Sequence, residues 1–298
     1  MIPELVKQAD SLTQALLSVG ADWAGAAFDR DGEPRDWFEM RDPEYIRRTL
    51  PGMKLTTDIY FRPTMRGLAN IPADGPCLLV GNHSGGILIA DTFVFSTAFY
   101  RHFSPLREFH QLAHDLVFRI PGVRAILSRW GTVPASPENM RRARERGAAL
   151  LVYPGGDEET YRPSWESTNI DFAGRTGFAR LALEHDVPII PVVAIGGQET
   201  ALFLGRGRRL ASVLQLNRFA RVKVLPAQLG PPLGVTIFDL PIRFPIPAKI
   251  TVTVGKPIDL RQRLGRDADP EEAYDLVTTN MQRTLTRLGN ERTIPVVG

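Results

Sequence analysis

The sequence predicts an α/β fold with a mostly parallel central sheet flanked by helices. Short runs of aliphatic and β-branched residues, typical of buried strands, occur at 55–61, 77–80, 148–153, 187–194 and 250–254. Predicted helices at 86–100, 112–118, 137–146 and 175–186 lie between these runs. Strands that alternate with helices are joined by crossover connections, which make neighbouring strands parallel. A last amphipathic helix is expected after Pro270.

The sequence predicts a helical appendage, residues 1–50, ahead of a main domain, residues 51–298. Apolar residues recur at spacings of three and four between residues 3 and 19, as on one face of an amphipathic helix. A polar connection follows up to residue 41. A second helix is expected from Asp42, because a capping residue, a proline and then Glu44 are typical of a helix start.

The composition is that of a globular protein without disulfides. The chain has 298 residues, of which 43% are apolar and 23% charged. Its single cysteine, Cys77, lies in an apolar run, so we expect a small buried core residue and no metal site built on cysteine. No run approaches the roughly 18 apolar residues that span a bilayer. Without a signal-peptide pattern at Met1, a cytoplasmic location is expected.

Charge is unevenly distributed along the chain. The net charge is +3, whereas residues 1–50 hold ten acidic and six basic side chains. Residues 200–238 contain no acid and six cations, Arg206, Arg208, Arg209, Arg218, Arg221 and Lys223. Such a surface suits phosphates of a membrane, a cofactor or nucleic acid, and a solvated loop is the alternative. The proline-rich segment 224–248 is expected to be an irregular loop with an apolar face.

The first candidate site follows the predicted strand 77–80, where Asn82 and His83 precede a glycine turn. Strand ends are where open α/β sheets place their sites. Asp91 lies in the apolar helix that follows, and a carboxylate there needs a polar partner. A carboxylate that holds one nitrogen of His83 leaves the other free for general-base chemistry. The alternative is that Asp91 caps the helix or accepts a structural hydrogen bond from the backbone, and that His83 is a buried core histidine.

A second candidate site lies at the turn of Gly155 and Gly156, after the predicted strand 148–153. The backbone N–H groups of such a turn bind oxyanions or phosphates. The turn ends in the acids Asp157, Glu158 and Glu159. A tight turn with solvated acids is the alternative interpretation.

Four blocks of sequence, taken in order, resemble the glycerolipid acyltransferase superfamily over about residues 55–260. They are Asn82-His83 with Asp91, Gly131–Ser136, Tyr153–Gly156 with Glu159, and Val187–Val192. The resemblance implies transfer of an acyl group from acyl-CoA or acyl carrier protein to a lipid hydroxyl, without a further cofactor or metal. It also implies peripheral contact with the inner face of a membrane and no nucleic-acid partner.

The resemblance also implies a role for each block. His83 would deprotonate the acceptor hydroxyl, and Asp91 would fix the histidine tautomer. Oxyanion or substrate binding would fall to Gly131, Thr132, Val133, Gly155, Gly156 and Glu159. Arg162 and Arg175 would bind phosphates of CoA or of a lipid headgroup.

Two features depart from the superfamily pattern. The superfamily places four residues between its histidine and aspartate, whereas seven separate His83 from Asp91, and the glycine turn would absorb the extra three. The usual spacing occurs at His110 and Asp115, where no strand and glycine turn precede it, so we regard that pair as coincidental. Glu158 occupies the position that the lysophosphatidate branch gives to arginine, which favours a neutral acceptor such as diacylglycerol or a fatty alcohol over lysophosphatidate.

Two other function classes stay open at this point. Ser84 lies in a sequence close to a nucleophile elbow, as in a serine hydrolase or thioesterase. That fold places its histidine late in the chain, whereas the last histidine here is His185. A non-catalytic lipid- or CoA-binding protein is the other alternative. Thioester consumption with and without an acceptor distinguishes the three classes.

Overall fold

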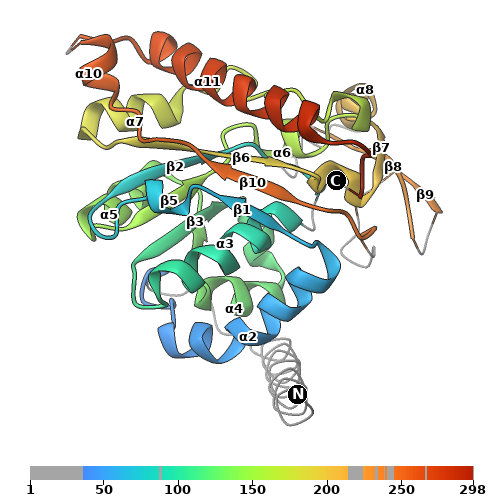
Figure 1. Cartoon of the computed structure of the whole chain (residues 1–298), viewed down its shortest axis with the longest axis horizontal. Helices are drawn as coiled ribbons and strands as arrows, with labels where there is room; N and C mark the ends of the chain where they lie inside the picture. Colours follow the sequence, from blue (N-terminus) through green and yellow to red (C-terminus); the bar gives the residue numbers. More distant parts are fainter. Residues whose placement is uncertain are drawn as a thin grey trace. The chain divides into compact units, whose positions relative to one another are not determined.

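The computed structural model describes residues 36–86, 89–213, 224–231, 234–237, 239, 245–265 and 267–297 (Figure 1). The predicted helix 3–19 and most of the predicted appendage lie outside these residues, as do Arg218, Arg221 and Lys223. No helix of the described part is long and apolar enough to cross a membrane.

The predicted α/β class is confirmed. The main sheet has the strand order β1 (Thr64–Arg66), β10 (Thr251–Val254), β6 (Ile189–Ile195), β2 (Cys77–Gly81), β5 (Ala149–Val152), β3 (Phe109–Ala113) and β4 (Thr132–Pro134). The pairs β1–β10, β2–β6, β3–β4 and β3–β5 are parallel, and β10–β6 is antiparallel. The sheet is therefore mostly parallel, as predicted.

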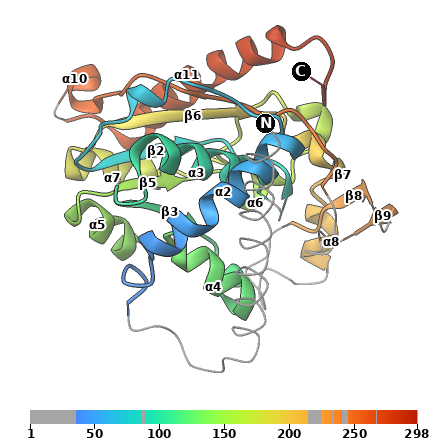
Figure 2. The same cartoon turned by 60° about the horizontal axis from the view of Figure 1, so that its bottom comes forward.

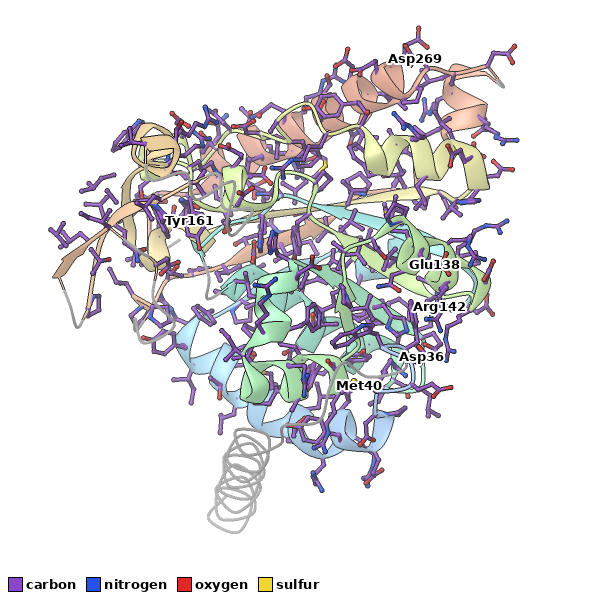
Figure 3. All side chains as sticks on the ribbon, turned by 180° about the vertical axis from the view of Figure 1, so that it is seen from behind. Asp36, Met40, Glu138, Arg142, Tyr161 and Asp269 are labelled. Carbon is purple, nitrogen blue, oxygen red and sulfur yellow. The ribbon has the colours of Figure 1, made fainter. Side chains whose placement is uncertain are left out.

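The chain forms two compact units, of which the first comprises the described residues up to 59, 72–77 and 97–152. Its helices are most of α2 (Pro43–Tyr60), the end of α3 (Ala90–Phe103), η3 (Asp115–Arg119), α4 (Pro121–Arg129) and α5 (Pro137–Glu145). Asp42 caps α2 as predicted, because its Oδ1 accepts the N–H groups of Glu44 and Tyr45 at 3.0 and 2.9 Å. Arg142 of α5 donates to Asp36 at 2.6 Å, and Figure 3 shows both side chains.

Two predicted elements of this unit are wrong. The predicted strand 55–61 is instead the end of α2 up to Tyr60. The β-branched Thr56 and Thr57 bond to helix carbonyls there, and Lys54 pairs with Asp58 one turn on. Residues 112–118 are no α-helix, because β3 extends to Ala113 and pairs on both sides before η3 begins. Tertiary pairing overrides a weak local pattern here. Cys77 is buried as predicted, and burial raises its thiol pKa to about 11.

The second unit comprises residues 60–71, 78–96 and the described part of 153–298. Its helices are η1 (Leu68–Asn70), the start of α3, α6 (Gly156–Thr160), η4 (Ser164–Glu166), α7 (Gly177–His185), η5 (Gly197–Thr200), α8 (Arg208–Val213), α10 (Leu260–Leu264) and α11 (Pro270–Glu291). Helix α11 lies along β6 and α7 (Figure 1). Its buried side chains recur every three to four residues, at Ala273, Val277, Met281, Leu285 and Leu288.

A second, antiparallel sheet belongs to this unit, with the strand order β7 (Leu202–Gly205), β8 (Ala227–Gly230) and β9 (Gly234–Thr236). Figure 2 shows its strands side by side next to α8. The expectation of an irregular segment over 224–248 is therefore corrected for β8 and β9. Short strands that contain glycine give a weak periodic signal, and β8 forms by pairing with β7 and β9 by pairing with β8.

Candidate active site

His83 and Asp91 meet in the structure despite the seven residues between them. The distance from His83 Nδ1 to Asp91 Oδ2 is 3.4 Å. Between strand β2 and helix α3, Gly85 and Gly86 adopt φ angles of 89° and 67°, a left-handed conformation that favours glycine. The glycine turn thus brings the histidine at the strand end back to the first turn of α3.

Asp91 is held by four donors other than the histidine. Its Oδ2 accepts the backbone N–H and the hydroxyl of Ser84 at 2.9 and 3.2 Å. Its Oδ1 accepts the backbone N–H and the hydroxyl of Thr92 at 2.8 and 3.3 Å. The side chain is only 1% exposed, and these bonds offset the loss of water around a buried carboxylate. The fixed carboxylate orients the proton of His83 Nδ1, which leaves Nε2 with the lone pair in the neutral ring.

The backbone of His83 is fixed from both sides. Its N–H donates to Glu159 Oε2 at 2.8 Å, and its carbonyl accepts Arg162 Nη1 at 2.7 Å. The residue before it, Asn82, exchanges two side-chain bonds with the backbone of Ala194 on β6, at 2.9 and 2.8 Å. The imidazole is therefore carried by a rigid strand end, the arrangement that catalytic geometry requires.

Tyr153 supports the ring of His83, a function that the sequence reasoning did not assign. The two rings stack with centroids 4.3 Å apart, and the Tyr153 hydroxyl lies within hydrogen-bond distance, 3.0 Å, of the hydroxyl of Thr92. A Cβ on Gly81 would lie 2.5 Å from the Tyr153 ring, so the glycine makes room for it. A glycine inside a fully buried strand is the sequence signal for such a close approach. Burial raises the pKa of Tyr153 well above its ordinary value, so the phenol stays neutral.

Glu159 and Arg162 form a buried pair under the histidine, with side chains 0% and 1% exposed and Nη1 3.8 Å from Oε1. Burial raises the pKa of Glu159 to about 7 against the opposing charge of Arg162, and burial lowers the pKa of Arg162. Arg162 also donates to the carbonyls of Glu159 and Ser167 at 2.9 and 3.2 Å. A guanidinium enclosed in this way does not face solvent, which argues against the expected phosphate contact of Arg162 and for a supporting role.

The other acids of the turn are each matched by an arginine. Arg175 donates to Asp157 Oδ1 at 3.0 Å and also to the carbonyls of Pro154 and Gly155, at 3.0 and 2.9 Å. The remaining acid, Glu158, lies 2.7 Å from Arg208 and 3.8 Å from Arg206. The three acids lie together in α6, as their sequence indicates, and nearby arginines compensate their negative charges.

Backbone hydrogen bonds or strand pairing already engage four of the expected oxyanion donors, Gly131, Thr132, Val133 and Gly156. Gly156 donates its N–H to the carbonyl of Tyr153 at 3.1 Å, which closes the turn. In the first unit, Gly131 donates to the carbonyl of Ser128 at 2.9 Å. Thr132 and Val133 belong to β4 and pair with residues 111 and 112 of β3. An oxyanion role for these residues and for Gly155 stays a prediction.

The second His–Asp pair differs in kind. His110 is fully buried in the first unit, with Nδ1 3.0 Å from the carbonyl of Gly131 and Nε2 3.0 Å from Glu108 Oε2. Both ring nitrogens face acceptors, so His110 is a structural histidine, which supports setting aside the pair with Asp115. In the described residues, no group of three or more His, Cys, Asp or Glu side chains is arranged to hold a metal.

The α/β fold and the histidine at its strand end fit the acyltransferase class, to which the sequence comparisons assign the chain. Residues 62–195, which include His83, Asp91 and Glu159, match the Acyltransferase family profile. An uncharacterized protein of Mycobacterium tuberculosis is 30% identical over 252 residues, covering 83% of this chain and 67% of that protein. The chain belongs to the glycerolipid acyltransferase superfamily, as its sequence blocks predict.

Two further similarities bear on the family and the fold. The human "DGAT1/2-independent enzyme synthesizing storage lipids" is 32% identical over 146 residues, covering 49% of this chain and 43% of that protein. The crystal structure of the 1-acyl-sn-glycerophosphate (LPA) acyltransferase PlsC from Thermotoga maritima matches with a TM-score of 0.55 and 16% identity, covering 98% of this chain and 99% of that one. The second similarity concerns the fold alone.

Proposed function

We propose that this protein transfers an acyl group from a thioester donor, acyl-CoA or acyl carrier protein, to the hydroxyl of a lipid. The observation that supports this most directly is the contact of His83 with Asp91 at a strand end, inside the segment that matches the family. A histidine held by a buried carboxylate is a general base, and thioester chemistry with an alcohol needs one.

In the proposed reaction, His83 Nε2 takes the proton of the acceptor hydroxyl as its oxygen attacks the thioester carbonyl. Asp91 stabilises the imidazolium that forms. The tetrahedral intermediate then collapses, the carbon–sulfur bond breaks, and the leaving thiolate takes the proton from His83. No acyl-enzyme forms, and this is consistent with Ser84, whose hydroxyl donates to Asp91 at 3.2 Å.

A neutral acceptor, such as diacylglycerol or a long-chain alcohol, fits the charges around the turn better than lysophosphatidate. Arg162 is buried, and Arg175 is bonded to Asp157 and to two carbonyls. A phosphate would have to displace one of these interactions and would meet the paired acids. A lipid acceptor also requires the enzyme to work at a membrane, and we infer peripheral binding at the inner face.

The test is incubation of the purified protein with radiolabelled acyl-CoA or acyl carrier protein and a panel of acceptors. The panel contains diacylglycerol, a long-chain alcohol, lysophosphatidate and no acceptor. Label in an ester product only when a hydroxyl lipid is present supports acyl transfer. Release of free fatty acid without an acceptor would indicate a thioesterase, and thioester binding with no turnover would indicate a carrier.

A further inference from the structure

The ring of Tyr153 lies flat against the imidazole of His83. The two ring planes differ by only 21° at a centroid distance of 4.3 Å, so the imidazole lies over the face of the phenol ring and not against its edge. Gly81 is two residues before His83, and such residues face the same side of an extended segment. A Cβ on Gly81 would lie 2.5 Å from the Tyr153 ring. The absent side chain at Gly81 therefore leaves the space in which the two rings stack.

The hydroxyl end of Tyr153 is held by the same carboxylate that holds the histidine. Its oxygen lies 3.0 Å from the hydroxyl of Thr92, and that hydroxyl donates to Asp91 Oδ1 at 3.3 Å. The other oxygen of Asp91 faces His83 Nδ1. One carboxylate thus orients the imidazole directly and the phenol through Thr92. This arrangement, all within the second unit, fixes the two rings relative to each other.

The charged groups around His83 give an imidazolium limited support. The contact of Nδ1 with Asp91 is 3.4 Å long, whereas charge-assisted N–H···O bonds measure about 2.7–2.9 Å. That carboxylate also accepts from four other donors. Arg162 Nη1, 2.7 Å from the carbonyl of His83, adds a positive charge that repels an imidazolium. Glu159, which accepts the N–H of His83, offsets that charge only when ionised, and burial raises its pKa to about 7.

The stacked arrangement favours the charged form of the histidine. An aromatic face carries partial negative charge and attracts a cation within about 6 Å of its centroid. A neutral imidazole gains less from this contact, and an interaction that is stronger in the transition state than in the ground state raises the rate. We propose that Tyr153 is a positioning residue whose ring face stabilises the imidazolium that His83 becomes when it takes the acceptor proton. This proposal rests on the proposed function, because proton transfer to His83 creates that cation during turnover.

The ring and the hydroxyl of Tyr153 are separated by two variants. Burial raises the pKa of the phenol well above its ordinary value, and the hydroxyl contacts Thr92, so we assign it the task of an anchor. Tyr153→Phe keeps the ring face and is expected to retain kcat within about threefold. Tyr153→Leu removes the face and is expected to lower kcat about tenfold with little change in KM.

The decisive experiment changes the charge of the ring face at nearly constant size. Phenylalanine with one, two or three ring fluorines is incorporated in place of Tyr153 in the full chain, and Tyr153→Phe is the reference. Fluorine withdraws electron density from the face, so kcat for acyl transfer is expected to fall stepwise, by about tenfold in all, with KM unchanged. The control is the same series at Phe178, a buried residue of the same unit that packs against the rings of Phe172 and Tyr274. No change in kcat is expected there.

A titration without substrate separates this proposal from the proposed function. The ring signals of His83 are followed by NMR and assigned by their absence from His83→Ala. As fluorines are added at position 153, these signals are expected to change at progressively lower pH, because the charged ring loses support. Glu159 is present in every member of the series, so its own titration does not distinguish them.

The outcomes divide clearly. A kcat or a His83 titration that does not depend on the fluorine content at position 153 would overturn the proposal, and so would equal losses in the Phe178 series. A stepwise shift of the titration in a protein that transfers no acyl group would support stabilisation of the imidazolium by Tyr153 and overturn the proposed acyl transfer instead.

Discussion

At His83, the ring is held by Asp91 and Tyr153 and the backbone by Glu159 and Arg162. We predict that His83→Ala lowers the rate of acyl transfer about 10²–10⁴-fold, the usual effect of removing a general base. The fold should stay intact, because the backbone of residue 83 keeps its bonds to Glu159 and Arg162. Initial rates with a thioester donor and a lipid acceptor measure the effect.

Two aspartate variants provide the matched comparison. Asp91→Asn is expected to reduce transfer strongly, since the amide no longer stabilises an imidazolium, whereas Asp115→Asn is expected to leave the rate near that of the unmodified protein. A His83→Ala protein within about threefold of full activity, or a larger effect at Asp115 than at Asp91, would contradict the assignment.

Glu159 gives the protein a specific pH dependence of stability. Its pKa is raised from 4.5 in the unfolded chain to about 7 in the fold, mainly by burial. Between these two values the folded state binds more protons than the unfolded state, so this group lowers the free energy of unfolding as pH rises through that window. We predict that Glu159→Gln, which cannot ionise, removes this fall. Urea denaturation at a series of pH values tests it, and an unchanged slope in the variant would contradict the prediction.

At the scale of elements, the glycine turn between β2 and α3 determines whether histidine and aspartate meet. Gly86 has φ +67°, and a Cβ there would overlap Asp239 and press on Phe203. We predict that Gly86→Ala loses at least tenfold in activity and more than about 1–2 kcal/mol of stability, the backbone penalty alone. Gly75→Ala is the control, because Gly75 has φ +76° with nothing within 4 Å of its Cβ. That variant should show the backbone penalty and full activity, and similar activities for the two would contradict the prediction.

The elements that could be predicted are those whose signals are local. The cap at Asp42 and the period of α11 need no partner to be recognised. The strands β1, β3, β4, β7, β8 and β9 are missing from the sequence prediction, because each is short and depends on pairing with other segments. The same cause explains the wrong strand at 55–61, where β-branched residues are accommodated in a helix by side-chain bonds and an ion pair.

At the scale of the whole molecule, the order of the sequence blocks predicts the fold and the pairing of His83 with Asp91. It does not predict which polar side chains are enclosed. Arg162 and Arg175 look alike in the sequence, yet one is 1% exposed under the histidine and the other 36% exposed beside Asp157. That difference arises from the packing of α6 and the segment up to α7, which no local pattern encodes. The stacking of Tyr153 on His83 is tertiary in the same way.

We expect the choice of acceptor to depend on the charged side chains around the turn of Gly155 and Gly156. We predict that, in competition, diacylglycerol or a long-chain alcohol is acylated in preference to lysophosphatidate, because the described arginines around the turn are already paired with acids or carbonyls.

Glu158→Arg is a poor test of this, since the new cation would lie beside Arg206 and Arg208 and destabilise the turn. Arg175→Ala is the better variant, because Arg175 is partly exposed and its loss leaves Asp157 uncompensated. That extra negative charge is expected to lower the use of lysophosphatidate further while the preference for a neutral acceptor persists. Lysophosphatidate as the best acceptor, with selective loss of its use in Arg175→Ala, would show instead that Arg175 binds the acceptor phosphate.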